Sequence, residues 1–307
     1  MISVSNLRKK YDTVEALKGI SFTIGEGEFY GLLGPNGAGK TTTISIMSTI
    51  VEPSAGEVNI AGYDLKKNPA ECKKNIGVVP QEIALYNELS AYDNLIFWGG
   101  LYTVPKRELI ARVEETLNLF GLTDRKNDKV KTYSGGMKRR INIASALLHK
   151  PKILFMDEPT VGIDPQSRNL IFEVIEKLHD EGMTIVYTTH YMEEAERFCD
   201  RIGIIDNGQI IAQGTLDELR NSSTMKETIV ITFTNLTEEL CNKISSGWKD
   251  LKRFDDVIHF YTMNVKNDLS KIILKCSDAG LDIMHIDIQK INLETIFLSL
   301  TGKQLRD

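Results

Sequence analysis

The sequence has no long apolar run. No stretch reaches the roughly 18 consecutive apolar residues that a membrane-spanning helix needs. The first residues, Met1 to Arg8, lack the hydrophobic centre of a secretory signal peptide and instead suggest the first strand of a domain. We therefore expect a soluble, cytoplasmic protein, and 307 residues leave room for two domains.

Cysteine and surplus charge are also scarce. The four cysteines show no C-x-x-C spacing, which favours reduced thiols over a zinc site or a disulfide framework. A net charge of −5 gives no electrostatic reason to expect nucleic-acid binding.

The segment from Gly34 to Thr42 reads GPNGAGKTT and fits G-x-x-x-x-G-K-[ST], the pattern of a phosphate-binding loop. An apolar run at 29–33 precedes it, as a buried strand would, and residues 41–47 can open a helix. A strand, a glycine loop and a helix N-terminus together surround one anion with backbone N–H groups. The alternative, a flexible glycine turn, would require neither the lysine nor the hydroxyl.

The chemistry of this loop indicates a nucleotide. We expect Lys40 to reach the β- and γ-phosphates and the Thr41 hydroxyl to bind Mg²⁺. Glycines at 34, 37 and 39 would let the backbone close on the phosphates. The predicted nucleotide-binding residues of the loop are Asn36, Gly37, Ala38, Gly39, Lys40, Thr41 and Thr42.

Polar side chains end three further apolar runs. The run 153–158 ends in Asp157 and Glu158, and in a parallel sheet both acids would lie at the edge where ligands bind. Asp157 suits a direct or second-shell contact to Mg²⁺, which prefers oxygen ligands. Glu158 suits the general base that polarises an attacking water.

The other two runs end in an amide and an imidazole. Gln81 follows the run 76–80 and would touch either the metal or the attacking water. His190 ends the run 184–189, where it can donate a hydrogen bond to a γ-phosphate. Earlier in the chain, 2–29 alternates as an antiparallel hairpin, and Tyr11 in its turn either stacks on a nucleotide base or is a plain surface tyrosine.

Residues 84–149 carry apolar residues at helical spacing in the stretches 94–102, 107–120 and 136–148, which predicts a separate helical lobe. Within it, Ser134, Gly135 and Gly136 precede a helix with a basic first turn, a second anion-binding N-terminus. One nucleotide does not need two such loops on one chain. Two copies arranged head to tail would use both, although a simple N-cap by Ser134 also explains the pattern.

In their order along residues 1–220, these segments resemble the nucleotide-binding subunit of an ATP-binding cassette (ABC) transporter. The six matching motifs are GPNGAGKTT (34–42), Gln81 after a strand, YSGGM (133–137), ILFMDE (153–158), GIDP (162–165) and TTH (188–190). The resemblance implies an α/β fold, a P-loop NTPase of the ABC type with a mixed sheet core, an antiparallel β subdomain and a helical subdomain.

The resemblance also implies roles. It implies ATP hydrolysis with Mg²⁺ at two composite sites in a dimer, with Tyr11 against adenine, Gln81 as the link to a membrane partner and Glu158 as the base. Ser134, Gly135 and Gly136 become a signature loop acting on the partner's nucleotide. Asp164 becomes an intersubunit contact and His190 the γ-phosphate switch. The usual signature is LSGGQ, so Tyr133 and Met137 depart from it and leave any role of the glutamine side chain in doubt.

Residues 221–307 have a different pattern, and we expect them to form an accessory or regulatory domain. Strands are predicted at 227–233, near 249–254, at 257–262 and at 282–289, with helices at 237–245 and 267–276. This β-α-β-β-α-β order favours a small α+β, ferredoxin-like domain. The domain is nearly neutral, so it is not a nucleic-acid arm.

The ending 292–302 and the stretch VGIDPQSR (161–168) resemble the branch of the family that includes bacterial drug- and sodium-export ATPases. This implies an ABC-2 type exporter subunit at the cytoplasmic face of the cell membrane, bound there through a separate transmembrane permease. The working assembly would be a homodimer or a pair with a related cassette subunit. The alternatives are a cassette ATPase acting on ribosomes or DNA, and a C-terminal domain that senses a small ligand.

Overall fold

A computed structural model describes residues 1–301 of the protein except 223–225, 235, 247, 249 and 290. The chain divides into two compact units, one of residues 1–216 and one that begins at Asp217 and continues through the remaining described residues. The sequence suggested a boundary after residue 220, within helix α8 (Leu216–Ser222).

A six-stranded sheet organises the first unit, with strand order β10-β9-β3-β8-β7-β6. Every pairing in it is parallel except that of β10 with β9. All residues of β3, β7 and β8 are buried, as expected for strands covered on both faces. The strands are β3 (Phe29–Leu33), β6 (Ile76–Val79), β7 (Ile153–Asp157), β8 (Thr184–Thr189), β9 (Arg201–Asp206) and β10 (Gln209–Gly214).

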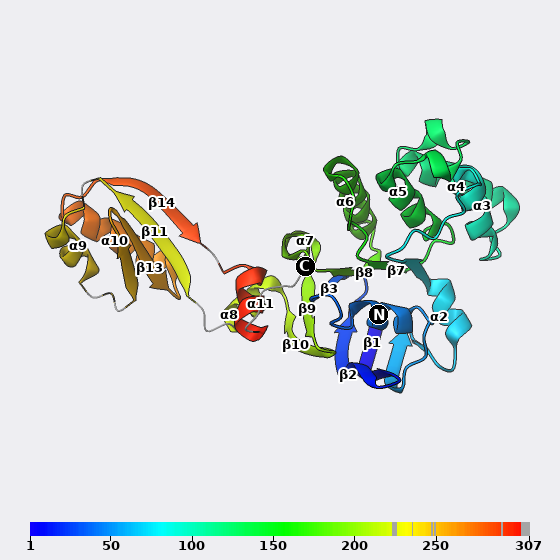
Figure 1. Cartoon of the computed structure of the whole chain (residues 1–307), viewed down its shortest axis with the longest axis horizontal. Helices are drawn as coiled ribbons and strands as arrows, with labels where there is room; N and C mark the ends of the chain where they lie inside the picture. The colour runs from blue at the N-terminus through cyan, green and yellow to red at the C-terminus, as the bar shows by residue number, and fades with distance from the viewer. Residues whose placement is uncertain (223–225, 235, 247, 249, 290, 302–307) are drawn as a thin grey trace. The chain divides into compact units, whose positions relative to one another are not determined.

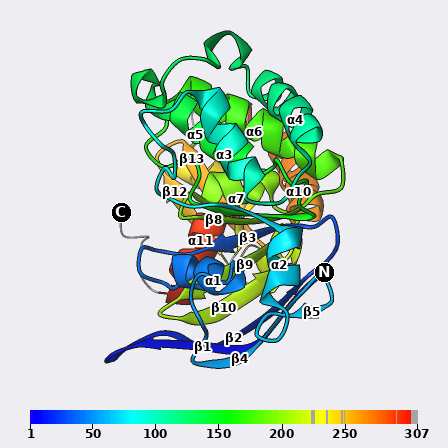
Figure 2. The same cartoon turned by 90° about the vertical axis from the view of Figure 1, so that its right-hand side faces the viewer.

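A second, antiparallel sheet of order β2-β1-β4-β5 lies below the first in Figure 2, with helix α1 (Lys40–Met47) between them. The predicted hairpin is confirmed, because β1 pairs with β2 from Ile2↔Ile24 to Tyr11↔Val14. Apolar residues of both sheets and of α1 form one core. The strands are β1 (Ile2–Tyr11), β2 (Val14–Ile24), β4 (Ala55–Ile60) and β5 (Tyr63–Asp64).

Helices cover the other face of the six-stranded sheet and extend into a lobe (Figures 1 and 2). The three predicted helices are present with shifted ends. The first begins earlier than expected because the Ser90 hydroxyl accepts a hydrogen bond from Asp93 N and caps it. After α1 the helices of this unit are α2 (Pro69–Asn75), α3 (Ala91–Gly100), α4 (Lys106–Leu119), α5 (Gly135–Ser145), α6 (Pro165–Asp180) and α7 (Met192–Phe198), with short 3₁₀ turns η1 (Thr123–Arg125) and η2 (Val130–Thr132).

The second unit follows the predicted β-α-β-β-α-β order, and its antiparallel sheet has the order β12-β13-β11-β14. Buried residues of the sheet and of α9 and α10 share one core, as in a ferredoxin-like arrangement. Lys249, the first residue of one predicted strand, and residues 223–225 and 302–307 lie outside the described residues. The elements are β11 (Glu227–Phe233), α9 (Glu238–Ser245), β12 (Leu251–Phe254), β13 (Val257–Thr262), α10 (Val265–Asp278), β14 (Ile283–Gln289) and α11 (Leu293–Thr301).

No helix of the described residues is both long and apolar enough to cross a bilayer.

Candidate functional site

The predicted phosphate loop connects β3 to α1, and its glycines are required for different reasons. Gly37 and Gly39 have φ of +79° and +112°, in the left-handed region that disfavours a side chain. A Cβ on Gly39 would lie 2.7 Å from Leu17 Cδ2, and one on Gly34 would lie 2.2 Å from the carbonyl oxygen of Ile205. Residues of neighbouring strands therefore leave no room for a side chain at 34 and 39, while a Cβ on Gly37 would meet open space.

Helix α1 begins directly after this loop. Gly39 occupies its N-cap position and has no side chain to bond the first-turn N–H groups. These N–H groups have no partner within the helix, so the positive end of the helix dipole lies at the loop. Asn36 and Thr41 are exposed at the rim, whereas Ala38 and Lys40 are buried. The geometry is that of an anion-binding cradle.

The Lys40 ammonium is held inside this cradle. Its side chain is only 4% exposed. Nζ donates hydrogen bonds to the carbonyl oxygens of Gly34 at 2.7 Å and Pro35 at 3.1 Å. It also lies 3.0 Å from Oε1 of Glu158. The lysine is thus fixed at the centre of the loop and paired with the carboxylate that follows β7.

Glu158 is the point where four predicted site residues meet. Its carboxylate is 5% exposed, with Oε1 3.3 Å from His190 Nδ1 and Oε2 accepting a hydrogen bond from Gln81 Nε2 at 3.3 Å. Lys40, Gln81, Glu158 and His190 follow β3, β6, β7 and β8, which form one continuous block in the sheet. Their clustering follows from the shared carboxyl edge of parallel strands.

The backbone at Glu158 is itself unusual. Its φ is +45°, a region that non-glycine residues rarely occupy. Its N–H donates to the Thr188 hydroxyl at 3.0 Å, and that hydroxyl donates to Asp157 Oδ1 at 2.6 Å. Thr188 therefore fixes both acids from the neighbouring strand. Strained backbone held in this way is common where side chains perform chemistry.

Ser134, Gly135 and Gly136 lie in a separate cluster on the helical lobe. The Ser134 hydroxyl accepts a hydrogen bond from Met137 N at 3.2 Å, so Ser134 does cap α5. A Cβ on Gly136 would lie 2.0 Å from Ser167 Oγ and 2.9 Å from Asp164 Oδ2. This loop is therefore packed against the start of α6 in its own chain.

Asp164 and Tyr11 occupy the ends of other elements. Asp164 caps α6 by accepting a hydrogen bond from Ser167 N at 2.9 Å, and the hydrogen bonds from Ser167 hold the pKa of its carboxyl below the usual value. Tyr11 ends β1, is 43% exposed, and has the Lys9 ammonium 4.9 Å from its ring centre. Its ring is thus open to solvent.

The two departures in the signature have structural explanations. Tyr133 is 5% exposed, and its hydroxyl donates to the Arg125 carbonyl oxygen at 2.7 Å. Met137 packs against the apolar core of the lobe. Tyr133 therefore fills a core position, and its hydroxyl is satisfied by the backbone.

The sequence did not single out two buried charged residues that support the site. Arg139 is 4% exposed and donates to the carbonyl oxygens of Pro80, at 2.8 Å, and Gln81. Burial lowers the pKa of its guanidinium. The sequence showed only a basic first turn here. Glu194, 2% exposed, is the second such residue, and its only signal was an acidic pair shortly after His190.

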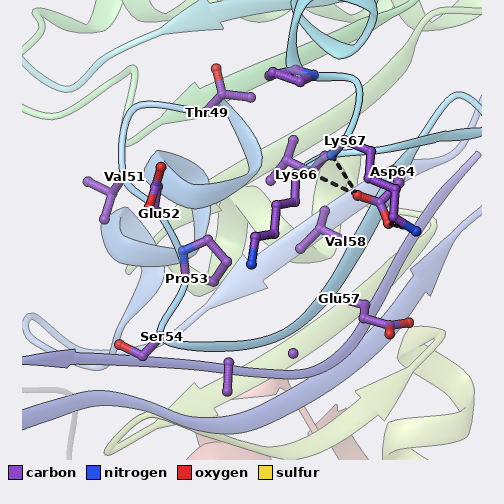
Figure 3. Close-up of a pocket in the computed structure, with 14 residues that line it drawn as sticks. Thr49, Val51, Glu52, Pro53, Ser54, Glu57, Val58, Asp64, Lys66 and Lys67 are labelled. Atoms are coloured by element: carbon purple, nitrogen blue, oxygen red, sulfur yellow. Dashed lines mark hydrogen bonds and ion pairs between the residues drawn. The ribbon is translucent and has the colours of Figure 1, made fainter.

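A pocket of about 430 Å³ lies away from these residues, beside β4 (Figure 3). It is lined by Thr49, the segments 51–58 and 64–67, and Pro69, and none of these is a predicted site residue. Asp64 accepts the N–H groups of Lys66 and Lys67 at 2.9 Å each, which holds the pKa of its carboxyl below the usual value. Asp64 is therefore held by backbone N–H groups and by the Lys67 ammonium, 3.7 Å from its Oδ2.

Comparisons with known proteins agree with this geometry. Residues 17–161 match the family model described as ABC transporter. The chain is 45% identical to the linearmycin resistance ATP-binding protein LnrL of Bacillus subtilis (strain 168), over 100% of both chains. It is 35% identical to the Nod factor export ATP-binding protein I of Burkholderia lata, over 100% of this chain and 98% of the relative.

Solved structures give the same result. The structure described as an ATP-binding subunit of an ABC transporter is similar at a TM-score of 0.67 and 32% identity, over 72% of this chain and 92% of that one. A dimeric ATP-binding cassette in a post-hydrolysis state, bound to ADP and Pi, is similar at a TM-score of 0.65 and 29% identity, over 70% and 98%.

Proposed function

The chain belongs to the ABC transporter family, and we propose that it is the ATP-hydrolysing subunit of an exporter that works through a separate ABC-2 type permease. The observation that carries this proposal is the grouping of Lys40, Gln81, Glu158 and His190 at one edge of the sheet. Two of the relatives are named for resistance to linearmycin and for Nod factor export. We expect this chain likewise to power export.

Each residue in the group has a role in ATP hydrolysis. The phosphate loop and Lys40 bind the β- and γ-phosphates by charge-assisted hydrogen bonds. Glu158 takes the proton of the attacking water. Its buried carboxylate lies beside both Lys40 and His190. His190 contacts the γ-phosphate. Tyr11, open to solvent, stacks on adenine.

The residues fit Mg²⁺, which would neutralise charge on the phosphates. Thr41, Gln81 and Asp157 supply hydroxyl, amide and carboxylate oxygens, the donors that Mg²⁺ prefers. Gln81 uses its amide N–H toward Glu158, which leaves its amide oxygen for the metal. Asp157 already receives the Thr188 hydroxyl on Oδ1, which leaves Oδ2 for a bound water or the ion.

The active unit in this proposal is a dimer with two composite sites. Ser134 to Gly136 stand at the N-terminus of α5, apart from the phosphate loop, and a helix N-terminus is suited to an anion. In a head-to-tail dimer this loop would bind the γ-phosphate held by the other copy, with Asp164 at the interface. A similar solved cassette is described as dimeric. The dimer consists either of two copies of this chain or of one copy and a related cassette subunit.

An aromatic surface directly after Gln81 suits the permease. Ile83, Tyr86, Leu89 and Phe97 are each at least 36% exposed, and the rings of Tyr86 and Phe97 meet edge to face at 4.9 Å. Exposed apolar groups gathered in this way are typical of interaction sites. Docking there would hold the chain at the cytoplasmic face of the membrane and connect the permease to Gln81.

A pull-down tests the assembly. Tagged Glu158→Gln protein is incubated with ATP and Mg²⁺, recovered from detergent-solubilised native membranes, and its partners are identified by mass spectrometry. We expect a stoichiometric multispan protein, and a Tyr86→Ser/Phe97→Ser variant should lose it while still binding ATP. Recovery of ribosomal or DNA-repair proteins without a membrane protein would favour the non-transport alternative.

The second unit is an accessory or regulatory domain in this proposal. Its core is separate, since the buried residues of β11, β13, α9 and α10 pack on one another. A chain ending at residue 220 should still bind ATP. If this truncated chain also assembles with the permease and hydrolyses ATP at the full rate, a regulatory or ligand-sensing role is ruled out.

A further inference from the structure

Glu194 lies in α7 and its side chain is 1% exposed. Both carboxylate oxygens are occupied. Oε1 accepts a hydrogen bond from the Thr160 hydroxyl at 2.8 Å and lies 2.7 Å from Arg168 Nη2. Oε2 accepts the hydroxyls of Tyr187 and Thr189, each at 2.8 Å. One buried carboxylate thus joins four side chains from three other segments.

These partners are neighbours of the proposed catalytic residues. Thr160 comes two residues after Glu158, and Thr189 comes directly before His190. The Thr189 hydroxyl also accepts a hydrogen bond from Tyr191 N at 2.9 Å, so it fixes the backbone on both sides of His190. Arg168 lies in the first turns of α6, the helix that Asp164 caps.

The Glu194 carboxylate itself is matched both in charge and in hydrogen bonds. A buried carboxylate is costly unless it is paired and hydrogen-bonded. Here Arg168 supplies the cation, and three hydroxyls fill the remaining positions. Burial raises the pKa of Tyr187 well above its usual value, so its phenol remains a proton donor. A buried carboxylate whose hydrogen bonds are all made rigidifies the elements that it joins.

We propose that Glu194 is a positioning residue for ATP hydrolysis, an inference that rests on the proposed function. It holds the turn that carries His190 and the segment that follows Glu158 in one fixed arrangement. The 3.3 Å approach of His190 Nδ1 to Glu158 Oε1 depends on that arrangement. Loss of the network displaces the two groups relative to the γ-phosphate without touching the loop that binds ATP.

Steady-state hydrolysis by purified full-length protein tests this. In Glu194→Gln we expect kcat to fall about 10- to 100-fold, with KM for ATP within about twofold of the wild type. Thr189→Val, which removes one hydroxyl, should lower kcat in the same direction. The double variant should cost little more than Glu194→Gln alone, because both changes break one unit. Glu193→Gln, an exposed neighbour, is the matched control and should match the wild type.

A second variant separates positioning from stability. Glu194→Gln leaves Arg168 without its carboxylate, so its Tm should fall. Adding Arg168→Met removes that cation but keeps an apolar side chain beside Phe172 and Tyr191. We expect the pair to regain Tm but not kcat. Recovery of both, or a folded Glu194→Gln with wild-type kcat, overturns the proposal, whereas an inactive wild type would overturn the proposed function instead.

Discussion

Nζ of Lys40 and Oε1 of Glu158 lie 3.0 Å apart, with both side chains at most 5% exposed. Lys40 opens α1 and Glu158 follows β7, so the pair joins the phosphate loop to the carboxyl end of the neighbouring part of the sheet. The lysine that binds phosphate and the proposed base are therefore electrostatic partners. Removing either charge leaves the other buried, which affects stability as well as catalysis.

Glu158→Gln should lower kcat for ATP hydrolysis by about 10² to 10⁴, because an amide cannot accept the proton of the attacking water. Binding of ATP should persist, and light scattering with ATP and Mg²⁺ should show a stable dimer. Glu173→Gln, the same change at an exposed position of α6, serves as the control and should behave as the wild type. A Glu158→Gln protein that stays monomeric with ATP bound would count against the composite site.

Lys40→Met should weaken ATP binding at least about tenfold, since it removes the charge-assisted contacts to the phosphates. It should also lower the free energy of unfolding by about 3 kcal/mol, because Glu158 loses its cation in a buried site. The double variant Lys40→Met/Glu158→Gln should recover much of that stability but none of the ATP binding. Urea unfolding and a fluorescent-nucleotide titration measure the two effects. Simple additivity of the two single variants would contradict the ion pair.

Gly136→Ala should destabilise the fold by about 1–3 kcal/mol, because its Cβ would lie 2.0 Å from Ser167 Oγ. Combining it with Ser167→Gly removes the Ser167 side chain and should recover part of the Tm, since Asp164 Oδ2 still lies 2.9 Å from the new Cβ. Gly135→Ala is the matched comparison, since its Cβ would meet nothing within 4 Å. We expect Gly135→Ala to keep the wild-type Tm. It should lower ATPase activity, because Gly135 faces the partner's nucleotide in the proposed dimer. Equal Tm loss in both alanine variants would be unexpected.

His149 makes stability depend on pH. Burial lowers the pKa of its imidazole, whose Nε2 lies 2.9 Å from the Ile76 carbonyl oxygen and whose ring stacks on Tyr102. Below about pH 6.5 the unfolded chain takes up a proton here that the folded chain resists, so stability falls as the pH is lowered. Urea unfolding at pH 7.5 and 5.5 should show a smaller loss for His149→Gln than for the wild type. His285→Gln, at an exposed position, should leave the loss unchanged.

Much of the fold could be predicted because local patterns were strong. The fully buried strands β3, β7 and β8 appear as apolar runs, and the glycine loop after β3 and the polar residues at the ends of β7 and β8 identified the site. The ends of two helices differ from the predicted ones. Helix α3 begins at Ala91 because of the Ser90 cap, and α5 ends at Ser145, three residues before the predicted Leu148.

The sequence by itself determined the phosphate loop, the acids after β7 and the histidine after β8, because these depend on residue type and on the order of strand, loop and helix. Only the tertiary structure decided why Gly34 and Gly136 must be glycine, since the groups that exclude a Cβ come from β9 and α6. The same holds for Arg139 and Glu194. Their importance comes from burial beside partners distant in sequence, and no local pattern of residues encodes that proximity.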